Sequence, residues 1–166
     1  MIVPDRIRGI ASRVIAELIA RKAMITTAES CTGGLIAGAL TSVPGSSDAV
    51  YGGYVTYSNE AKTRMIGVSE ALLDAHGAVS EEVARAMAEG ARMTAETDFA
   101  IAATGIAGPT GGSADKPVGL VHFAVASPQG VAHLRENFGD LGRDQIREAS
   151  VIVALEMLLA AAAEEQ

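Results

Sequence analysis

The sequence predicts an α/β fold: a three-layer α/β/α sandwich on a mixed, largely parallel sheet with a C-terminal hairpin. Segments with helical periodicity alternate with short apolar segments along most of the chain, which is typical of helices packed on both faces of a sheet. Near the C-terminal end, two strand-like segments are separated only by a short turn at 127–130. Strands joined so closely pair antiparallel, and this makes the sheet mixed.

Composition favours a single domain over 1–166 and narrows the choice of partners. The chain has 166 residues, of which 49% are hydrophobic and 4% aromatic, and its net charge is −7. This length can bury a substantial core, and the acidic balance lacks the basic footprint of a nucleic-acid-binding protein. The single cysteine, Cys31, excludes an intrachain disulfide, argues against a cysteine-based zinc cluster and suits the cytoplasm. Charges interrupt the N-terminal segment and 151–163 is too short for a bilayer, so we expect neither signal peptide nor membrane span.

In the first half of the chain, a long helix precedes two strands. Residues 4–22 predict an amphipathic helix, because apolar side chains recur every three or four positions. The short segment 24–28 predicts a strand that leads into a turn. A helix is expected over 32–43, where Pro44-Gly45 ends it. The loosely alternating segment 50–57 predicts the next strand.

The second half holds the remaining helices, an apolar strand and the hairpin. Short helices are expected at 60–66 and 69–76, and a longer one at 80–94 with Ser80 as its N-cap. The elements that follow are an apolar strand at 99–103, a glycine-rich loop at 104–117, hairpin strands at 118–126 and 131–138, and a final helix at 143–162.

The turn after the first strand contains a serine, Ser30, and two glycines, Gly33 and Gly34. Glycine inside a helix costs about 1 kcal/mol relative to alanine, so helix propensity does not explain the pair. Glycines allow close approach to the backbone, and N–H groups at a helix start, here those of Thr32, Gly33 and Gly34, can bind an anion or a developing oxyanion. Ser30 is therefore a candidate nucleophile. The alternative is that it only caps the helix.

A serine nucleophile needs a base, and Lys62 is the best candidate. The histidines, His76, His122 and His133, fall in a turn and in the hairpin strands, which favours solvated or sheet-packed side chains. Lysine is a known alternative partner of a nucleophilic serine. Lys62 and Tyr57 follow a strand, where α/β folds place their sites, and Tyr57 could fix the lysine amine by a hydrogen bond or relay a proton. The alternative is a solvated lysine, whose pKa of about 10.4 makes it a poor base.

Two further segments are candidates for substrate contacts. The glycine-rich loop lacks the P-loop pattern, but its backbone N–H groups can approach a phosphate or a sugar; otherwise it is a flexible connection. Its candidate contacts are Thr104, Gly105, Ala107 and Gly108. Arg143 and Arg147 open the final helix, where cations oppose the helix dipole. They either recognise a phosphate or carboxylate or pair with acidic neighbours at the surface.

Four motifs, in this order, resemble the C-terminal domain family of CinA proteins: TAESCTGG (27–34), GYVTYSNEAK (53–62), ATGIAGP (103–109) and GRDQIR (142–147). The resemblance covers nearly the whole chain and is closest to the stand-alone form, which lacks the extra N-terminal domain of some members. It implies that Ser30 is the nucleophile, with Lys62 and Tyr57 as its partners. The family's characterised activity is hydrolysis of the carboxamide of nicotinamide mononucleotide to nicotinate mononucleotide and ammonia.

The resemblance thus implies a small-molecule substrate, nicotinamide mononucleotide. The sequence shows no metal cluster, so we expect the implied hydrolysis to need neither metal nor cofactor, and composition favours neither nucleic acid nor membrane as partner. The loop 104–112 and the two arginines would supply the phosphate site. Two other hypotheses stay open: a Ser–Lys amidase of different specificity, and a non-catalytic nucleotide-binding or partner module in which Ser30 is only a cap. The many small apolar residues also allow a homo-oligomer.

Overall fold

A five-stranded sheet organises the molecule, of which a computed structural model describes residues 3–164. The strand order is β2-β1-β3-β4-β5. The strands are β1 (Ile25–Glu29), β2 (Val50–Val55), β3 (Phe99–Gly105), β4 (Leu120–Ser127) and β5 (Gly130–Asn137). β1 pairs parallel with β2 and β3, whereas β3–β4 and β4–β5 are antiparallel. The predicted mixed sheet and hairpin are confirmed, with parallel pairing confined to β2, β1 and β3.

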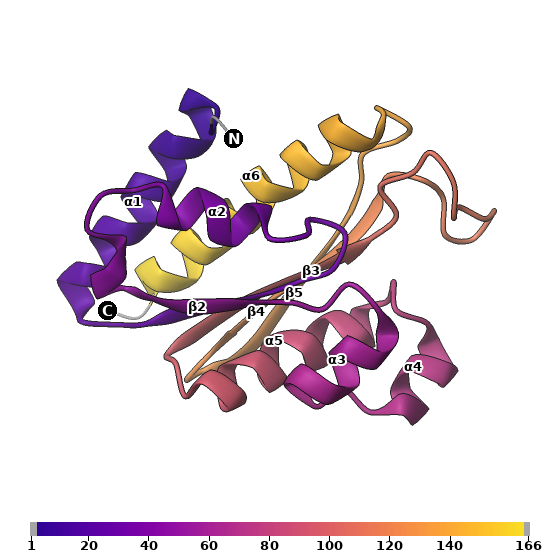
Figure 1. Ribbon diagram of the computed structural model, residues 1–166, viewed down its shortest axis with the longest axis horizontal. Coiled ribbons are helices and arrows are strands. Elements are labelled where there is room, and N and C mark those ends of the chain that lie inside the picture. Colours follow the sequence, from indigo (N-terminus) through magenta and orange to yellow (C-terminus); the bar gives the residue numbers. More distant parts are fainter. Residues whose placement is uncertain (1–2, 165–166) are drawn as a thin grey trace.

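Helices cover both faces of this sheet (Figure 1), and the predicted three-layer sandwich is confirmed. One face carries α1 (Asp5–Arg21), α2 (Leu35–Thr41) and α6 (Arg143–Glu164), and the other carries α3 (Asn59–Ile66), α4 (Glu70–His76) and α5 (Glu81–Ala95). A short 3₁₀ helix, η1 (Ser46–Asp48), precedes β2. Ser58, Ser69 and Ser80 cap α3, α4 and α5 by accepting a hydrogen bond from the backbone N–H three residues later.

The two faces of the sheet carry side chains of different size, because successive residues of a strand point to opposite sides. Phe99, Ile101 and Phe123 are buried in the core shared with α1, α2 and α6. Toward α5 the sheet presents small side chains, including Ala100 and Ala102. Such small side chains let α5 lie close to the sheet, and α3 packs against α5 beside the ends of β1 and β2.

The helix predicted over 32–43 is shorter than expected. Gly33 and Gly34 have φ angles of 57° and 98°, in the left-handed region that other residues rarely adopt, and α2 starts only at Leu35. The two glycines therefore shape the turn before the helix and do not form its first turn. This difference places the backbone of the Ser30 turn outside regular secondary structure.

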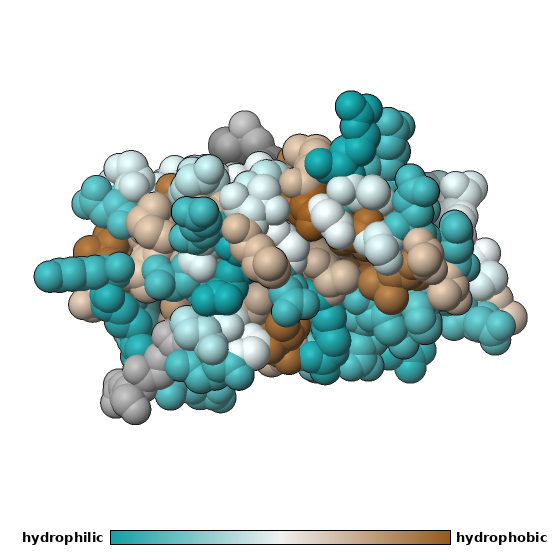
Figure 2. All heavy atoms as spheres, turned by 90° about the horizontal axis from the view of Figure 1, so that it is seen from below, coloured by the Kyte–Doolittle hydropathy of each residue, from teal (hydrophilic) through white to brown (hydrophobic). Residues whose placement is uncertain are grey.

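The face formed by α3, α4 and α5 is mostly polar. Figure 2 shows hydrophobic residues there as separate patches among hydrophilic ones. Within residues 3–164, no helix combines the length and the apolar character needed to cross a membrane.

Candidate functional site: a serine–lysine pair at the ends of the parallel strands

Ser30 follows the last residue of β1, and its backbone N–H donates to the carbonyl of Ala103 in β3 at 2.9 Å. Lys62 comes from the middle of α3, on the other side of the strand end. Its Nζ lies 3.0 Å from Ser30 Oγ. The structure therefore brings together the two side chains that the sequence singled out as nucleophile and base, which lie 32 positions apart in the chain.

Lys62 is a buried lysine, because its side chain is only 1% exposed. Besides Ser30, its Nζ donates to the carbonyl of Thr56 at 2.9 Å and to that of Tyr57 at 3.5 Å. Burial lowers the pKa of Lys62 from 10.5 to about 8, because the charged ammonium loses its hydration. The alternative of a solvated helix lysine is wrong.

These contacts define what a neutral Lys62 can do. An uncharged amine has two N–H donors and one lone pair. With the two donors on the carbonyls of Thr56 and Tyr57, the lone pair is left for the hydroxyl proton of Ser30. This geometry would allow a neutral Lys62 to take the proton of the Ser30 hydroxyl as a general base.

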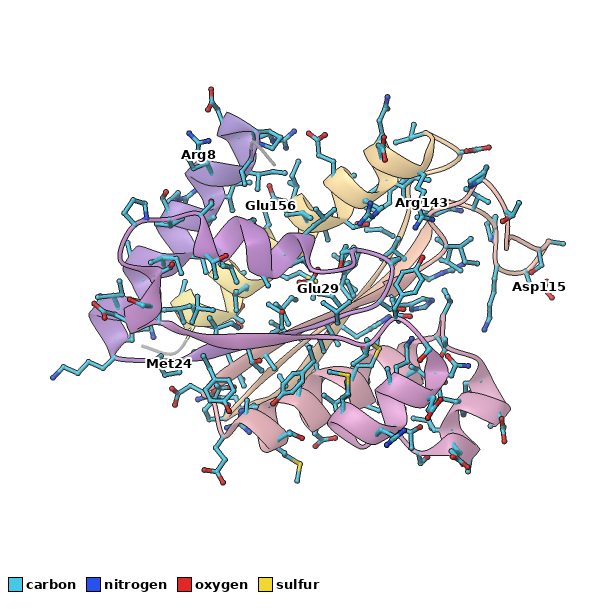
Figure 3. The ribbon with its side chains drawn as sticks, in the orientation of Figure 1. Arg8, Met24, Glu29, Asp115, Arg143 and Glu156 are labelled. Atoms are coloured by element: carbon cyan, nitrogen blue, oxygen red, sulfur yellow. The ribbon has the colours of Figure 1, made fainter. Side chains whose placement is uncertain are left out.

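Glu29, which sequence reasoning missed, binds the backbone where the turn after β1 leads into α2. Its carboxylate is fully buried, and it accepts from the backbone N–H groups of Gly34, Ile36 and Ala37 at 3.1, 3.0 and 2.8 Å. Figure 3 shows Glu29 between the sheet and α2. An acidic residue just before a helix is the available signal, because a carboxylate stabilises the N-terminal end of a helix.

This cap changes which backbone groups remain for an oxyanion. The N–H of Gly34 is bound by Glu29, and the N–H of Gly33 donates to the carbonyl of Ser30 at 3.1 Å. Thr32 differs, because neither its backbone N–H nor its buried Oγ1 has a hydrogen-bond partner in the part of the chain that the structure describes. Of the three predicted donors in this turn, Thr32 is the one whose N–H is available.

The two arginines that open α6 contact the site in different ways. Arg147 donates from Nε to the carbonyl of Cys31 at 3.1 Å and from Nη2 to that of Thr32 at 3.3 Å. Arg143, labelled at the N-terminal end of α6 in Figure 3, donates to the carbonyl of Gly108 and to the hydroxyl of Tyr57, both at 3.0 Å. Neither guanidinium forms an ion pair within residues 3–164, so surface pairing does not explain their positions.

Tyr57 lies at the rim of the site with 59% of its surface exposed. Its hydroxyl bonds to Arg143, and its main-chain carbonyl, not its phenol, lies near Lys62. The expectation that the phenol fixes the lysine amine is therefore replaced by a contact from the backbone.

The glycine-rich loop contributes less to the site than its sequence suggested. Thr104 Oγ1 donates to the carbonyl of Ala78 at 2.8 Å, and Ala107 is buried in the core. A Cβ at Gly105 would lie 2.7 Å from the carbonyl oxygen of Leu120, so glycine is needed there for packing against β4. Gly108 is the loop residue that reaches the site, through its carbonyl bond to Arg143.

The two histidines of the hairpin are packed on the sheet, as their strand positions predicted, and neither has a hydrogen bond to Ser30 in the described part of the chain. His122 Nδ1 and His133 Nε2 are 2.9 Å apart, and His133 Nδ1 lies 3.6 Å from Glu81 Oε2. Burial and the charge of a protonated His133 lower the pKa of His122 to about 4. In the described part of the chain, no group of three or more His, Cys, Asp or Glu side chains is arranged to hold a metal ion.

Fold and site together define an α/β protein with a buried serine–lysine pair at the ends of its parallel strands. The model of the CinA C-terminal domain matches residues 7–162, and the chain belongs to this family. The resemblance found in the four motifs is thereby confirmed.

Curated relatives include a CinA-like protein of Synechococcus sp. (strain RCC307), 51% identical over 90% of this chain and 36% of its own length. A CinA-like protein of Mycolicibacterium paratuberculosis is 52% identical over 87% of this chain and 34% of its own. The chain thus spans about a third of the length of these relatives.

Solved structures agree with this placement. The competence/damage inducible protein CihA of Agrobacterium tumefaciens has a TM-score of 0.94 and 52% identity, covering 96% of this chain and 98% of its own. A CinA superfamily protein of Escherichia coli has a TM-score of 0.90 and 35% identity, covering 97% and 94%.

Proposed function

We propose that the protein is a nicotinamide-nucleotide amidohydrolase that converts nicotinamide mononucleotide to nicotinate mononucleotide and ammonia. The observation that carries the proposal is the 3.0 Å contact between Ser30 Oγ and the Nζ of a lysine that is 1% exposed. A buried lysine with a lowered pKa is expensive to maintain for structure alone, and such groups cluster at functional sites. The substrate follows from the family resemblance of the motifs that contain these residues.

The proposed reaction uses Ser30 and Lys62 twice. Ser30 Oγ attacks the carboxamide carbon while Lys62 takes the hydroxyl proton, and the carbonyl electron pair moves onto the oxygen, which the N–H of Thr32 can bind. The C–N bond then breaks, and Lys62 returns its proton to the departing nitrogen, which leaves as ammonia. Water then attacks the resulting ester while Lys62 takes its proton. The C–O bond to Ser30 breaks, Lys62 returns the proton to Ser30 Oγ, and the released acid ionises to the carboxylate.

Arg143 is the proposed contact for the substrate phosphate. Its guanidinium lies at the rim, uses one N–H for Gly108 and one for Tyr57, and has five N–H groups in all, so donors remain for an anion. The guanidinium of Arg147 is engaged with the carbonyls of the Ser30 turn, which supports a structural task for it. Gly105, Ala107 and Thr104 serve packing in the first place, so Gly108 is the loop residue proposed near the substrate.

Cys31 is the neighbouring nucleophile that must be excluded. Burial raises the pKa of its thiol to about 12, so the reactive thiolate is scarce near neutral pH. This supports Ser30 as the attacking residue.

Ammonia release from nicotinamide mononucleotide tests the proposal. Ser30 does not cap α2, because its hydroxyl is hydrogen-bonded to Lys62. Wild-type protein and Cys31→Ala are expected to turn over, and Ser30→Ala is expected to be inactive with a free energy of unfolding within about 1 kcal/mol of wild type, the value of one hydrogen bond. Near-normal turnover by Ser30→Ala would refute the nucleophile. Turnover of a phosphate-free amide alone would favour the Ser–Lys amidase of other specificity, and a wild type inert toward all amides would favour the non-catalytic module. The cytoplasmic location and a homo-oligomer stay predictions.

A further inference from the structure

Glu29 is a buried carboxylate whose partners are unusual for its charge. It is fully buried, and within residues 3–164 it makes no ion pair; its partners are three backbone N–H groups at the start of α2. Removing a carboxylate from water is costly unless several strong hydrogen bonds replace hydration. A neutral side chain at the end of β1 would be buried at a lower desolvation cost than a carboxylate. We therefore expect the carboxylate to have a more specific task than packing.

Glu29 connects both halves of the serine–lysine pair. Because successive strand residues point to opposite sides, the side chain of Glu29 reaches α2 while that of Ser30 reaches Lys62 on α3. The main-chain carbonyl of Glu29 accepts from the N–H of Thr56 at 2.8 Å. The carbonyl of Thr56 in turn accepts from Lys62 Nζ at 2.9 Å. The carboxylate of Glu29 thus holds the turn that carries the nucleophile, and its main-chain carbonyl joins that turn to the strand end that holds the base.

Arg147 also holds the turn 30–34, through hydrogen bonds to its carbonyl groups. Glu29 binds N–H groups at its end, whereas Arg147 binds the carbonyls of Cys31 and Thr32. Fixing the carbonyls of consecutive peptide groups also fixes the direction of the N–H groups between them, because each peptide unit is planar. The N–H of Thr32, which has no partner in the described chain, belongs to the peptide whose carbonyl is that of Cys31.

We infer that Glu29 is a positioning residue of the reaction: its carboxylate sets the turn 30–34 so that Ser30 Oγ meets Lys62 and the N–H of Thr32 faces the developing oxyanion. The inference rests on the proposed function, because it needs Ser30 to be a nucleophile. It differs from a purely structural cap, which would affect unfolding without affecting the chemical step.

The test compares Glu29→Gln, Glu29→Asp and Ser69→Ala. Glutamine keeps the shape but presents an NH₂ group to a backbone N–H, and aspartate keeps the charge on a shorter side chain. Ser69→Ala removes the serine cap of α4, a side chain whose hydrogen bond is to Leu72 and not to Ser30, Lys62 or the turn 30–34. Two rates are measured: ammonia release from nicotinamide mononucleotide, and covalent labelling of Ser30 by a fluorophosphonate, followed by mass spectrometry. Thermal unfolding checks that each variant is folded.

We expect Glu29→Gln to lower kcat and the labelling rate of Ser30 by roughly 10²-fold, as for a lost oxyanion donor, with KM within about threefold of wild type. Glu29→Asp should recover part of both rates, and Ser69→Ala should lower the melting temperature with kcat unchanged. The inference is overturned if folded Glu29→Gln keeps kcat and labelling within threefold, or if Ser69→Ala loses kcat equally. If Glu29→Gln does not fold, Glu29→Asp decides by the same two rates.

The labelling rate separates this inference from the proposed function. A wild type that is labelled at Ser30 but releases no ammonia refutes the proposed substrate, and the labelling rates of the variants still decide the role of Glu29. A wild type that is neither labelled nor active overturns both.

Discussion

Replacing Lys62 by methionine should abolish turnover and at the same time stabilise the protein at neutral pH. Lys62 is buried, and its pKa is lowered from 10.5 to about 8. Between these two pKa values the unfolded chain binds the proton and the native state does not, so stability falls as the pH drops from about 10.5 to about 8 and then stays level. At 1.36 kcal/mol for each pKa unit, the native state at pH 7 carries a cost of roughly 3 kcal/mol.

Methionine removes that cost and keeps an unbranched side chain of similar length. It also leaves the carbonyls of Thr56 and Tyr57 without their donor, at about 1 kcal/mol each. The expected net gain is therefore about 1 kcal/mol at pH 7, measured by urea unfolding. It should vanish near pH 9, where the cost of the charged lysine has fallen to about 2 kcal/mol, and become a loss of roughly 1.5 kcal/mol near pH 10.5. A loss of several kcal/mol at pH 7 would contradict the assignment of a destabilising buried amine.

The same pKa fixes the pH dependence of turnover. At pH 7 a pKa of about 8 leaves roughly 9% of the lysine neutral, compared with ~0.03% at a pKa of 10.5, a gain of about 300-fold in active base. We expect kcat/KM to rise about tenfold from pH 7 to pH 9 and then level off. Lys62→Arg, which stays protonated, should be nearly as inactive as Lys62→Met. A fully active Lys62→Arg, or a flat profile between pH 7 and pH 9, would refute proton transfer by this residue.

Three further predictions concern the rim, the α6 arginines and the hairpin. Tyr57→Phe removes the hydroxyl that bonds Arg143 but keeps the carbonyl near Lys62, so we expect KM to rise a few-fold with kcat nearly unchanged; a large loss of kcat alone would return the phenol to the chemical step. Arg143→Gln should raise KM for nicotinamide mononucleotide and spare a phosphate-free amide, whereas Arg147→Gln should lower kcat for both, and equal behaviour of the two variants in steady-state kinetics would contradict the separate roles. The lowered pKa of His122, about 4, means that neutral histidine is favoured in the native state, so its contribution to stability is present above about pH 6.5 and is lost as the pH falls to about 4, by at most about 3 kcal/mol; melting temperatures from pH 7 to pH 4 should fall less steeply for His122→Gln than for wild type, and parallel curves would contradict this.

The site could be predicted from sequence where one residue type and its place in the pattern decided the matter. Lys62 could be chosen because the chain has few lysines and this one follows a strand, and Ser30 because glycines follow it directly. The start of α2 was misplaced because the positive φ angles of Gly33 and Gly34 do not show in residue periodicity. Glu29 was missed because carboxylates are seldom fully buried, although an acid before a helix start was a usable signal.

The contacts that could not be predicted are those between distant segments. The carbonyls that receive Arg147 lie more than a hundred positions earlier in the chain, and charge patterning gives no indication of a partner that is backbone. Likewise, the bond between His122 and His133 depends on the register of the hairpin, which pairs His122 with Arg135 and Ala124 with His133, so that the two rings are diagonal neighbours. Element type follows from local pattern, whereas these partners follow from register and packing.

The turn 30–34 and its partner Arg147 in α6 are far apart in the sequence, so they are synthesised at different times. The segment with Ser30 and Lys62 leaves the ribosome first, whereas Arg147, which holds the carbonyls of Cys31 and Thr32, follows the strand pair β4–β5. Since N-terminal parts of a chain are made before C-terminal parts, the nascent protein passes through a stage in which its serine and lysine exist without the arginine that completes their turn. Reactivity at Ser30 is thus expected to reach its full level only when the last helix docks, and unfinished chains would carry a less reactive serine.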